Sequence, residues 1–224
     1  MNALVIGATG LCGSAILKYA TNDCKLFSNV YSISRREIPN CGDSVKSIIN
    51  EDTETWIDSI PDGINVLFSA LGTTKAAAGS IENQYKIDHG LNLAVAKAAK
   101  EKGCKTLVLV SSLGASIESR LPYFKMKGEL ERDVLALGFE RTILLRPGVL
   151  LGERDSNYTG FGRSLITKLA SWIYRGKLQY LLGCPVYADE VGKVAVKLSV
   201  DDGTDKNKVK IVHSSGILET ANSD

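Results

Sequence analysis

The strongest constraint on this chain is a glycine-rich turn close to its first residue. Gly7, Gly10 and Gly13 follow the short apolar stretch Ala3–Ile6 and open the amphipathic stretch Leu11–Ala20. In such a strand–turn–helix unit, the first glycine permits the tight turn and the second lets a pyrophosphate approach the backbone. The third allows the helix to pack closely against the strand. Free N–H groups at the helix start then bind the phosphates. The turn therefore predicts a dinucleotide-binding fold, and its setting makes a purely structural turn the weaker interpretation.

Within this turn we expect a bound dinucleotide to contact Gly7, Thr9, Gly10, Leu11, Cys12 and Gly13. Cys12 has two interpretations. Its thiol lies near the positive end of a helix dipole, which can make a thiol sensitive to oxidation. A small side chain that fills space at the start of the helix is the simpler role, and we favour it.

Short apolar stretches alternate with helix-length amphipathic stretches along the whole chain, which predicts an α/β fold with a parallel sheet. The expected strands are Ala3–Ile6, Val30–Ser34, Val45–Ile49, Asn65–Ala70, Thr106–Val110, Thr142–Arg146 and Lys208–Val212. The expected helices are Leu11–Ala20, Asp52–Ile60, Ser80–Lys102, Pro122–Leu137, Gly162–Tyr174 and Asp189–Ser199. We predict one Rossmann-type, doubly wound domain over residues 1–224, in which roughly residues 149–224 contribute a small substrate side.

Composition excludes several classes of protein. A chain of 224 residues suits one domain, and a net charge of +2 gives no reason to expect a nucleic-acid partner. The five cysteines are scattered and the two histidines lie far apart, so we expect neither a disulfide framework nor a metal site. No apolar run approaches the about 20 residues that span a bilayer. We also expect no cleavable presequence, because the first strand begins at Ala3.

The end of the second expected strand indicates which dinucleotide binds. Enzymes that use NAD usually place an acidic residue there to bind the ribose 2′-hydroxyl. This strand ends instead in Ser34, Arg35 and Arg36. A guanidinium suits the 2′-phosphate of NADP, so the sequence favours NADP(H). The alternative is that both arginines are solvated and that Glu37 binds the ribose, although Glu37 lies further from the strand.

A serine, a tyrosine and a lysine form the candidate catalytic group. Ser111 and Ser112 follow the strand Thr106–Val110, at the edge where α/β sheets place their sites. Tyr123 and Lys127 share one helix face. The ammonium of Lys127 would favour the phenolate of Tyr123 and lower its pKa, while Ser112 would hold a substrate oxygen and Lys127 would bind the nicotinamide ribose. In the alternative, Tyr123 is a half-buried aromatic residue and Lys127 a solvated one.

These motifs, together with the later Leu145-Arg146-Pro147-Gly148, resemble the atypical short-chain dehydrogenase/reductases over nearly the whole chain. Four segments are most similar to a fungal mitochondrial branch of that family, which is related to an animal oxidoreductase: 75–79, 84–89, 125–129 and 151–154. The resemblance implies that Pro147 and Gly148 lie beside the nicotinamide and that Asp52 lies near the adenine. It also implies peripheral attachment to the mitochondrial outer membrane, with the cytoplasm as the alternative. The proton-relay asparagine of typical members is replaced by Asp88.

The sequence is compatible with two functions. The first is an NADPH-dependent oxidoreductase that acts on a small carbonyl or hydroxyl compound. The second is an NADP(H)-binding regulatory module that acts through protein partners without turnover. The helix expected at Gly162–Tyr174 is amphipathic and basic, so it could lie on an anionic membrane. A core face or a roof over the substrate pocket is the more common role of such a helix.

Overall fold

The computed structural model describes residues 1–22, 26–39, 44–152, 183–201 and 208–223, together with 172, 174–176 and 179. Its main sheet has seven parallel strands in the order β3-β2-β1-β4-β5-β6-β9. The strands are β1 (Asn2–Ile6), β2 (Asn29–Ser34), β3 (Val45–Ile49), β4 (Val66–Ser69), β5 (Thr106–Val110), β6 (Arg141–Arg146) and β9 (Val209–His213). A small parallel pair, β7 (Leu150–Leu151) and β8 (Val186–Tyr187), lies apart from it. The predicted α/β fold is confirmed.

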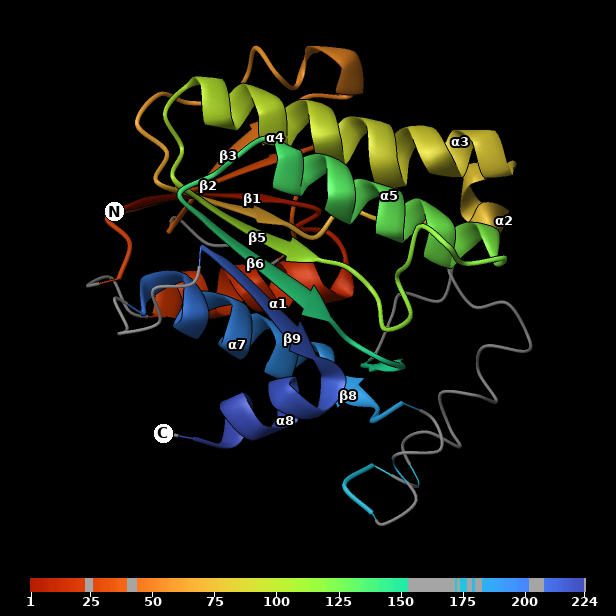
Figure 1. Ribbon diagram of the computed structural model, residues 1–224. Coiled ribbons are helices and arrows are strands. Elements are labelled where there is room, and N and C mark those ends of the chain that lie inside the picture. Colours follow the sequence, from red (N-terminus) through yellow and green to blue (C-terminus); the bar gives the residue numbers. More distant parts are fainter. Residues whose placement is uncertain are drawn as a thin grey trace.

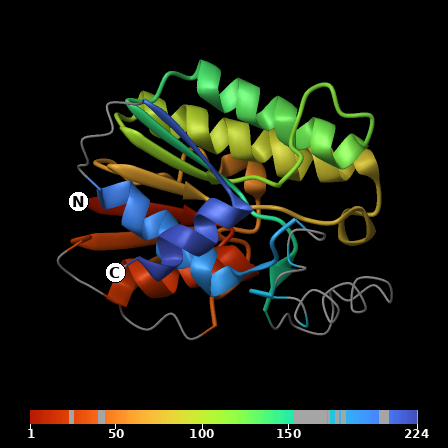
Figure 2. The ribbon, with the colours of Figure 1, turned by 60° about the horizontal axis from the view of Figure 1, so that its bottom comes forward.

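Helices cover both faces of this sheet (Figure 1). They are α1 (Leu11–Asn22), α2 (Lys75–Ala78), α3 (Ile81–Tyr85), α4 (Asn92–Glu101), α5 (Pro122–Ala136), α7 (Ala188–Val200) and α8 (Ser214–Asn222). Helices α4 and α5 lie on one face, and α1 and α7 lie on the other. Figure 2 brings this second face forward and shows α8 beside α7. The strand order reverses between β1 and β4, so the sheet is doubly wound.

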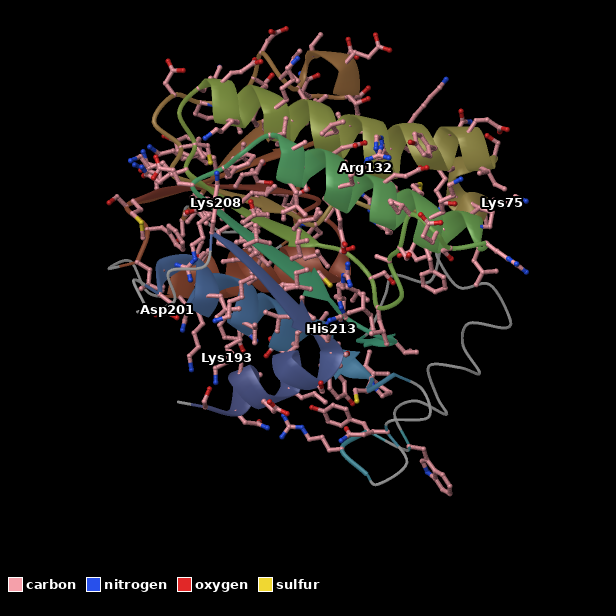
Figure 3. All side chains as sticks on the ribbon, viewed as in Figure 1. Lys75, Arg132, Lys193, Asp201, Lys208 and His213 are labelled. Atoms are coloured by element: carbon pink, nitrogen blue, oxygen red, sulfur yellow. The ribbon has the colours of Figure 1, made fainter. Side chains whose placement is uncertain are left out.

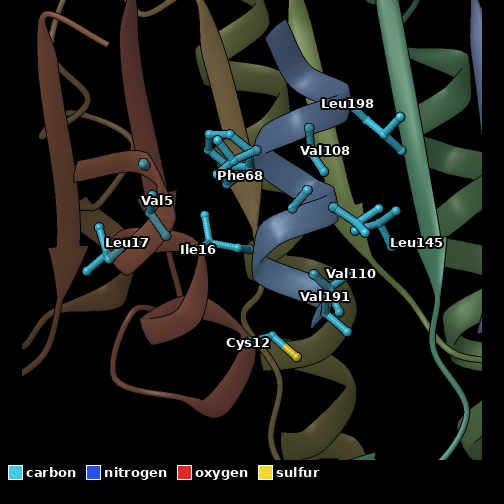
Figure 4. Close-up of a cluster of buried hydrophobic side chains, with 14 of the residues drawn as sticks. Val5, Cys12, Ile16, Leu17, Phe68, Val108, Val110, Leu145, Val191 and Leu198 are labelled. Atoms are coloured by element: carbon cyan, nitrogen blue, oxygen red, sulfur yellow. The ribbon is translucent and has the colours of Figure 1, made fainter. Parts of the chain in front are cut away.

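The hydrophobic core has two halves, one on each face of the sheet, because successive strand residues point to opposite faces. Val108 and Val110 of β5 pack toward α1 and α7, whereas Leu107 and Leu109 pack toward α4 and α5. Figure 4 shows the half beneath α1 and α7, where Cys12 lies among apolar side chains. The thiol is buried, which supports its predicted role as a small space-filling side chain.

Two predicted helices differ from the structure. The stretch Ser80–Lys102 is interrupted by a π-helical turn, η2 (Lys86–Leu91), between α3 and α4. The stretch Asp52–Ile60 forms only the short 3-10 helix η1 (Thr53–Thr55) and further tight turns. In these turns the N–H groups of residues 55, 56, 58 and 59 each donate to the carbonyl three residues earlier. Trp56 anchors the turns, because its indole N–H donates to the Asn50 carbonyl at 2.9 Å.

Several elements were not predicted: α2, α8 and the pair β7–β8. The predicted helix Gly162–Tyr174 lies outside the described residues, apart from 172 and 174. Much of the region 149–224 belongs to the main layers, because β9 extends the sheet and α7 packs against α1. Among the described residues, no helix is long and apolar enough to cross a membrane.

Candidate functional site

The glycine-rich turn has the geometry that its three glycines predict. Gly7 adopts a φ of +80°, and a Cβ there would lie 2.5 Å from the backbone of Ala70. A Cβ at Gly13 would lie 2.1 Å from the Gly7 carbonyl oxygen, so α1 can pack onto the turn only because this residue is glycine. A Cβ at Gly10 would meet only the Gly7 oxygen, at 3.3 Å. The turn is therefore closed on its inner side and open where the helix begins.

A cavity of about 470 Å³ lies beside this turn, at the carboxyl ends of β1, β2, β3 and β4. In open α/β sheets, ligands bind at this edge, next to the point where the strand order reverses. The cavity is lined by Gly7, Thr9, Ile33, Ser34, Arg35, Arg36, Glu51, Trp56 and Leu71. The predicted residues Gly7, Thr9, Arg35 and Arg36 are thus brought together from two separate loops. Sequence analysis missed Trp56, because its nearest signal was an amphipathic pattern attributed to a helix.

The charges around the cavity come from loops at the ends of two strands. Arg35 and Arg36 are exposed, and the Ser34 hydroxyl donates to the Arg36 carbonyl at 2.7 Å, which fixes the loop that carries them. Glu51 is the acidic residue of the lining. The other acid considered for the ribose, Glu37, is exposed and lies outside the lining. Two guanidinium groups against one carboxylate give this end of the cavity a positive charge.

Asp52, expected near the adenine, stands next to the cavity residue Glu51. Its side chain caps the short helix η1, because the carboxylate accepts the N–H of Glu54 at 3.0 Å. Glu51 lines the cavity, whereas Asp52 does not. The described structure therefore assigns Asp52 a local structural role in the turn that brings Trp56 to the cavity.

The candidate catalytic residues lie further along the same edge of the sheet. Ser112 follows β5, and Tyr123 and Lys127 occupy the first turns of α5, the helix that comes next. Tyr123 is 40% exposed and its ring packs edge-to-face on Phe124. Ser112 is half-buried, and its hydroxyl donates to the Leu113 carbonyl at 3.3 Å. Ser111 is buried, and its hydroxyl has no hydrogen-bond partner in the described structure.

Lys127 differs from the solvated lysine of the alternative interpretation, because its side chain is only 4% exposed. Its Nζ lies 3.4 Å from Oδ2 of Asp88, which is buried in η2. Burial raises the pKa of Asp88 above its usual range, against the opposing effects of the Lys127 ammonium and of a hydrogen bond from the Thr73 N–H. Asp88 therefore lies beside the candidate catalytic lysine, as a direct ion-pair partner.

Three polar residues of the interrupted helix hold the loop that follows β4. Gln84 donates to the Thr73 carbonyl at 3.1 Å, Asp88 accepts the Thr73 N–H at 2.6 Å, and Asn92 donates to the Leu71 carbonyl at 3.2 Å. We call Gln84, Asp88 and Asn92 the polar seam. They are spaced four residues apart, so they share one helix face, and all three are buried. This spacing is a signal that sequence analysis overlooked.

Pro147 and Gly148 directly follow β6, where the chain leaves the sheet. The Pro147 carbonyl accepts the N–H of Leu113, at 2.8 Å, so the loops after β5 and β6 are joined. The Gly148 N–H donates to the Ser214 hydroxyl at 2.9 Å, and a Cβ at Gly148 would lie 2.2 Å from the Gly183 oxygen. Both residues therefore hold loops together at the edge of the sheet that carries Ser112.

A second ion pair joins α5 to strand β6 of the sheet. Arg146, the last residue of β6, makes two hydrogen bonds to the buried carboxylate of Glu131, at 3.0 and 2.5 Å. The bond to Glu131 raises the pKa of Arg146, against the effect of burial. Figure 3 shows His213 at the corresponding end of β9, the neighbouring strand. In the described residues, no group of three His, Cys, Asp or Glu side chains could hold a metal ion.

Sequence comparison places the chain among fungal proteins. A family model described as HIM1 matches residues 16–174. "Protein FMP52, mitochondrial" from Eremothecium gossypii is 59% identical over 218 residues, which cover 97% of this chain and 96% of that protein. The protein of the same name from Saccharomyces cerevisiae is 54% identical over 223 residues, which cover 98% and 96% of the two chains.

Comparison with solved structures supports the same fold. A structure described as MoeE5 in complex with UDP-glucose and NAD has a TM-score of 0.69 and 16% identity, over 99% of this chain and 81% of that one. A short-chain dehydrogenase family protein from Francisella tularensis has a TM-score of 0.65 and 15% identity, over 97% and 98% of the two chains. At these identities the likeness establishes the Rossmann-type fold alone, because one fold can carry many different activities.

Proposed function

This chain belongs to the HIM1 family, and from that premise we propose that it is an NADP(H)-dependent oxidoreductase of the short-chain dehydrogenase type. Its substrate would be a small carbonyl or hydroxyl compound. The observation that carries the proposal is the cavity that Gly7 and Thr9 share with Arg35 and Arg36. It combines a glycine-rich turn that would bind the phosphates with two guanidinium groups where the adenosine ribose would lie. That pairing suits a 2′-phosphate better than a free hydroxyl.

When bound, the dinucleotide would supply the hydride. This chain's residues would bind its phosphates at the glycine turn and its 2′-phosphate at Arg35 and Arg36. Ser112 would orient the substrate oxygen, and the Tyr123 hydroxyl would donate or accept the proton at that oxygen. The buried ammonium of Lys127 would contact the nicotinamide ribose and stabilise the Tyr123 phenolate. Pro147 and Gly148 would border the nicotinamide.

Calorimetric titration of NADPH and NADH tests the cofactor assignment. One charge-assisted hydrogen bond to a phosphate contributes about 1.5–3 kcal/mol, so NADPH should bind roughly ten- to a hundredfold more tightly than NADH. The double variant R35A/R36A should lose this preference, whereas Arg132→Ala, which removes an exposed arginine of α5, should keep it. Equal affinities for both cofactors in the wild type would contradict the choice of NADP(H).

A screen of aldehydes, ketones and quinones with NADPH tests the catalytic assignment. With any substrate found, Tyr123→Phe should reduce turnover by about 10²–10⁴-fold, the range attributed to a positioned acid or base. Folding and NADPH affinity should change little, because Tyr123 is 40% exposed. Full activity of Tyr123→Phe would disprove its role. A wild type that binds NADPH but turns over none of these compounds would favour the regulatory module.

We also propose a location from the names of the relatives, which are described as mitochondrial. The protein would attach peripherally to the outer face of the outer mitochondrial membrane. Alkaline carbonate should then release it from isolated mitochondria, and added protease should degrade it while the outer membrane is intact. Retention in the carbonate pellet would contradict peripheral attachment, and protection from the protease would contradict the outer face. The relation to an animal oxidoreductase stays a prediction.

A further inference from the structure

We propose that Asp88 is a positioning residue, which holds the Lys127 ammonium in place and fixes it relative to the cofactor loop after β4. This inference rests on the proposed function, because it assigns Lys127 a role toward the cofactor. Its basis is geometric. One carboxylate oxygen of Asp88 faces Lys127 Nζ at 3.4 Å, and the other accepts the Thr73 N–H at 2.6 Å. A single buried carboxylate thus joins α5 to the loop 71–74.

Burial shields this ion pair from water more than an ion pair at the surface. The side chains of Asp88 and Lys127 are only 1% and 4% exposed, so water competes little for either charge. The loop also passes close to the carboxylate, since a Cβ at Gly72 would make an ordinary van der Waals contact with Asp88 Oδ2, at 3.5 Å. The ammonium therefore has little freedom to move away from the position that Asp88 gives it.

The π-helical turn explains how Asp88 reaches this position. A π-turn leaves backbone carbonyls without their usual helical partners, and such turns are frequent at functional sites. The Asn92 side-chain amide donates to the carbonyls of Ile87 and Asp88, at 3.1 and 3.0 Å, and its oxygen accepts from the Ser69 hydroxyl. Asn92 thereby stabilises the widened turn from within, and η2 keeps the Asp88 side chain buried beside Lys127.

The consequence reaches the cofactor cavity through the loop after β4. Leu71 lines that cavity, and the polar seam holds the loop at the Leu71 carbonyl and at both backbone groups of Thr73. A change at Asp88 therefore alters two things together: the position and charge of Lys127, and the backbone that borders the cavity. An ordinary core residue would affect neither of them specifically.

The experiment compares NADPH affinity across a pH range for the wild type, Asp88→Asn and Asp88→Glu. Asparagine keeps an oxygen that can accept the Thr73 N–H but removes the counter-charge of Lys127. A buried ammonium without a counter-charge loses its proton at lower pH. Near neutral pH, Asp88→Asn should therefore bind NADPH roughly tenfold more weakly. The affinity of Asp88→Asn should also begin to fall at a lower alkaline pH than that of the wild type.

Asp88→Glu keeps the charge but moves it by one methylene, so its affinity should fall while its alkaline profile stays near that of the wild type. The matched control is Asp133→Asn. Asp133 is a carboxylate of α5 that pairs with His89 and with Arg132, which Figure 3 labels, instead of with Lys127. This control should match the wild type at every pH. Thermal unfolding of each variant shows whether it is folded at the temperature of the titration.

Folded Asp88→Asn with wild-type affinity at every pH would overturn the proposal, since the ion pair would then be structural only. If Asp88→Asn does not fold, wild-type affinity in folded Asp88→Glu would overturn it instead, because displacement of the charge would have no effect. If the wild type binds no NADPH, the proposed function fails before any variant is compared, and the role of Asp88 falls with it. The two failures are therefore distinguishable.

Discussion

The two ends of the candidate site are built in different ways. At the dinucleotide end, the structure depends on backbone that comes very close to other backbone, as Gly13 does to Gly7. At the end that carries Tyr123 and Lys127, it depends on buried polar side chains that satisfy one another, with Asp88 at their centre. The first end therefore has no room for an added atom at Gly7 or Gly13, whereas the second depends on balanced charge at Lys127.

The two ends also differ in whether neighbouring or distant residues determine their structure. The glycine turn spans seven neighbouring residues, so its conformation depends mainly on consecutive residues of the sequence. The contact between Asp88 and Lys127 joins residues far apart in the chain, and it needs both the π-turn and the docking of α5. Variants at the two ends should thus fail by different mechanisms, and each of the following predictions tests that contrast.

The largest effect is expected for Gly13→Ala. The new Cβ would lie 2.1 Å from the Gly7 oxygen and 2.5 Å from the Gly7 carbonyl carbon, both of which are backbone atoms. Side chains cannot move aside to relieve this clash, so α1 must shift away from the turn. We expect a loss of more than about 4 kcal/mol in the free energy of unfolding, or failure to fold.

The matched control for this substitution is Gly90→Ala in η2. A Cβ there would meet no atom within 4 Å, and alanine in a helix usually stabilises by about 0.5–1 kcal/mol relative to glycine. Urea unfolding of both variants measures the difference. Similar stabilities of Gly13→Ala and Gly90→Ala would show that the turn relaxes easily, and the contrast between the two ends would then fail.

Sequence analysis predicted the fold well where the signal is local. The bounds of β3 and β5 are those expected, and the other predicted strands differ by one residue at one or both ends. The residues Gly7, Gly10 and Gly13 were recognised from their order alone. The turn around Trp56 was mistaken for a helix, because an apolar residue at helical spacing does not reveal that its indole N–H bonds to Asn50.

The candidate site was predicted in parts. Arg35 and Arg36 were expected at the cofactor, and the structure places both in the cavity lining. The pair Tyr123 and Lys127 was expected to interact through the charge of Lys127, but that charge is held by Asp88 in the described structure. Helical periodicity identified a long helix over Ser80–Lys102 and could not show the π-turn, since Asn92 stabilises that turn through side-chain hydrogen bonds to two carbonyls within it.

An intermediate effect is expected for Lys127→Met, which removes one partner of the buried ion pair. Asp88 would remain buried without a counter-charge, which costs about 3 kcal/mol in the free energy of unfolding near neutral pH. Burial raises the pKa of Asp88, so the carboxyl takes up a proton more readily in the folded protein. The stability of the variant should therefore increase as the pH falls toward the Asp88 pKa, and decrease as the pH rises through it.

Urea unfolding of Lys127→Met at several pH values measures this dependence. The double variant D88N/K127M serves as the control, because it has neither charge and should show no such recovery in acid. A loss of stability in Lys127→Met that is constant over pH would mean that the lost packing of the lysine side chain dominates. The end of the site that carries Lys127 would then resemble an ordinary core.

The smallest effect is expected at an ion pair between α7 and α1, the helix that follows the glycine turn. Asp189 of α7 accepts hydrogen bonds from Lys18 and Tyr19 of α1, both at 2.5 Å, and so joins the two helices. The hydrogen bond to Asp189 raises the pKa of Tyr19 to about 12. The Asp189 pKa is lowered: burial acts to raise it, but the bonds to Lys18 and Tyr19 outweigh that effect. The side chains of Lys18 and Asp189 are 64% and 50% exposed, so water and salt screen this pair.

Asp189→Asn should therefore cost less than about 1 kcal/mol near neutral pH, a small fraction of the loss in Lys127→Met. A carboxylate with a lowered pKa stabilises the fold above its unfolded pKa, and this contribution disappears as the pH falls through the folded value. The difference between variant and wild type should thus persist down to about pH 4 and vanish below it. High salt should reduce the difference near neutral pH, while leaving the Lys127→Met effect largely unchanged. If instead Asp189→Asn and Lys127→Met cost the same, a solvent-exposed charge would matter as much as a buried one. The dinucleotide end would then also depend on balanced side-chain charge, and the contrast between the two ends would fail.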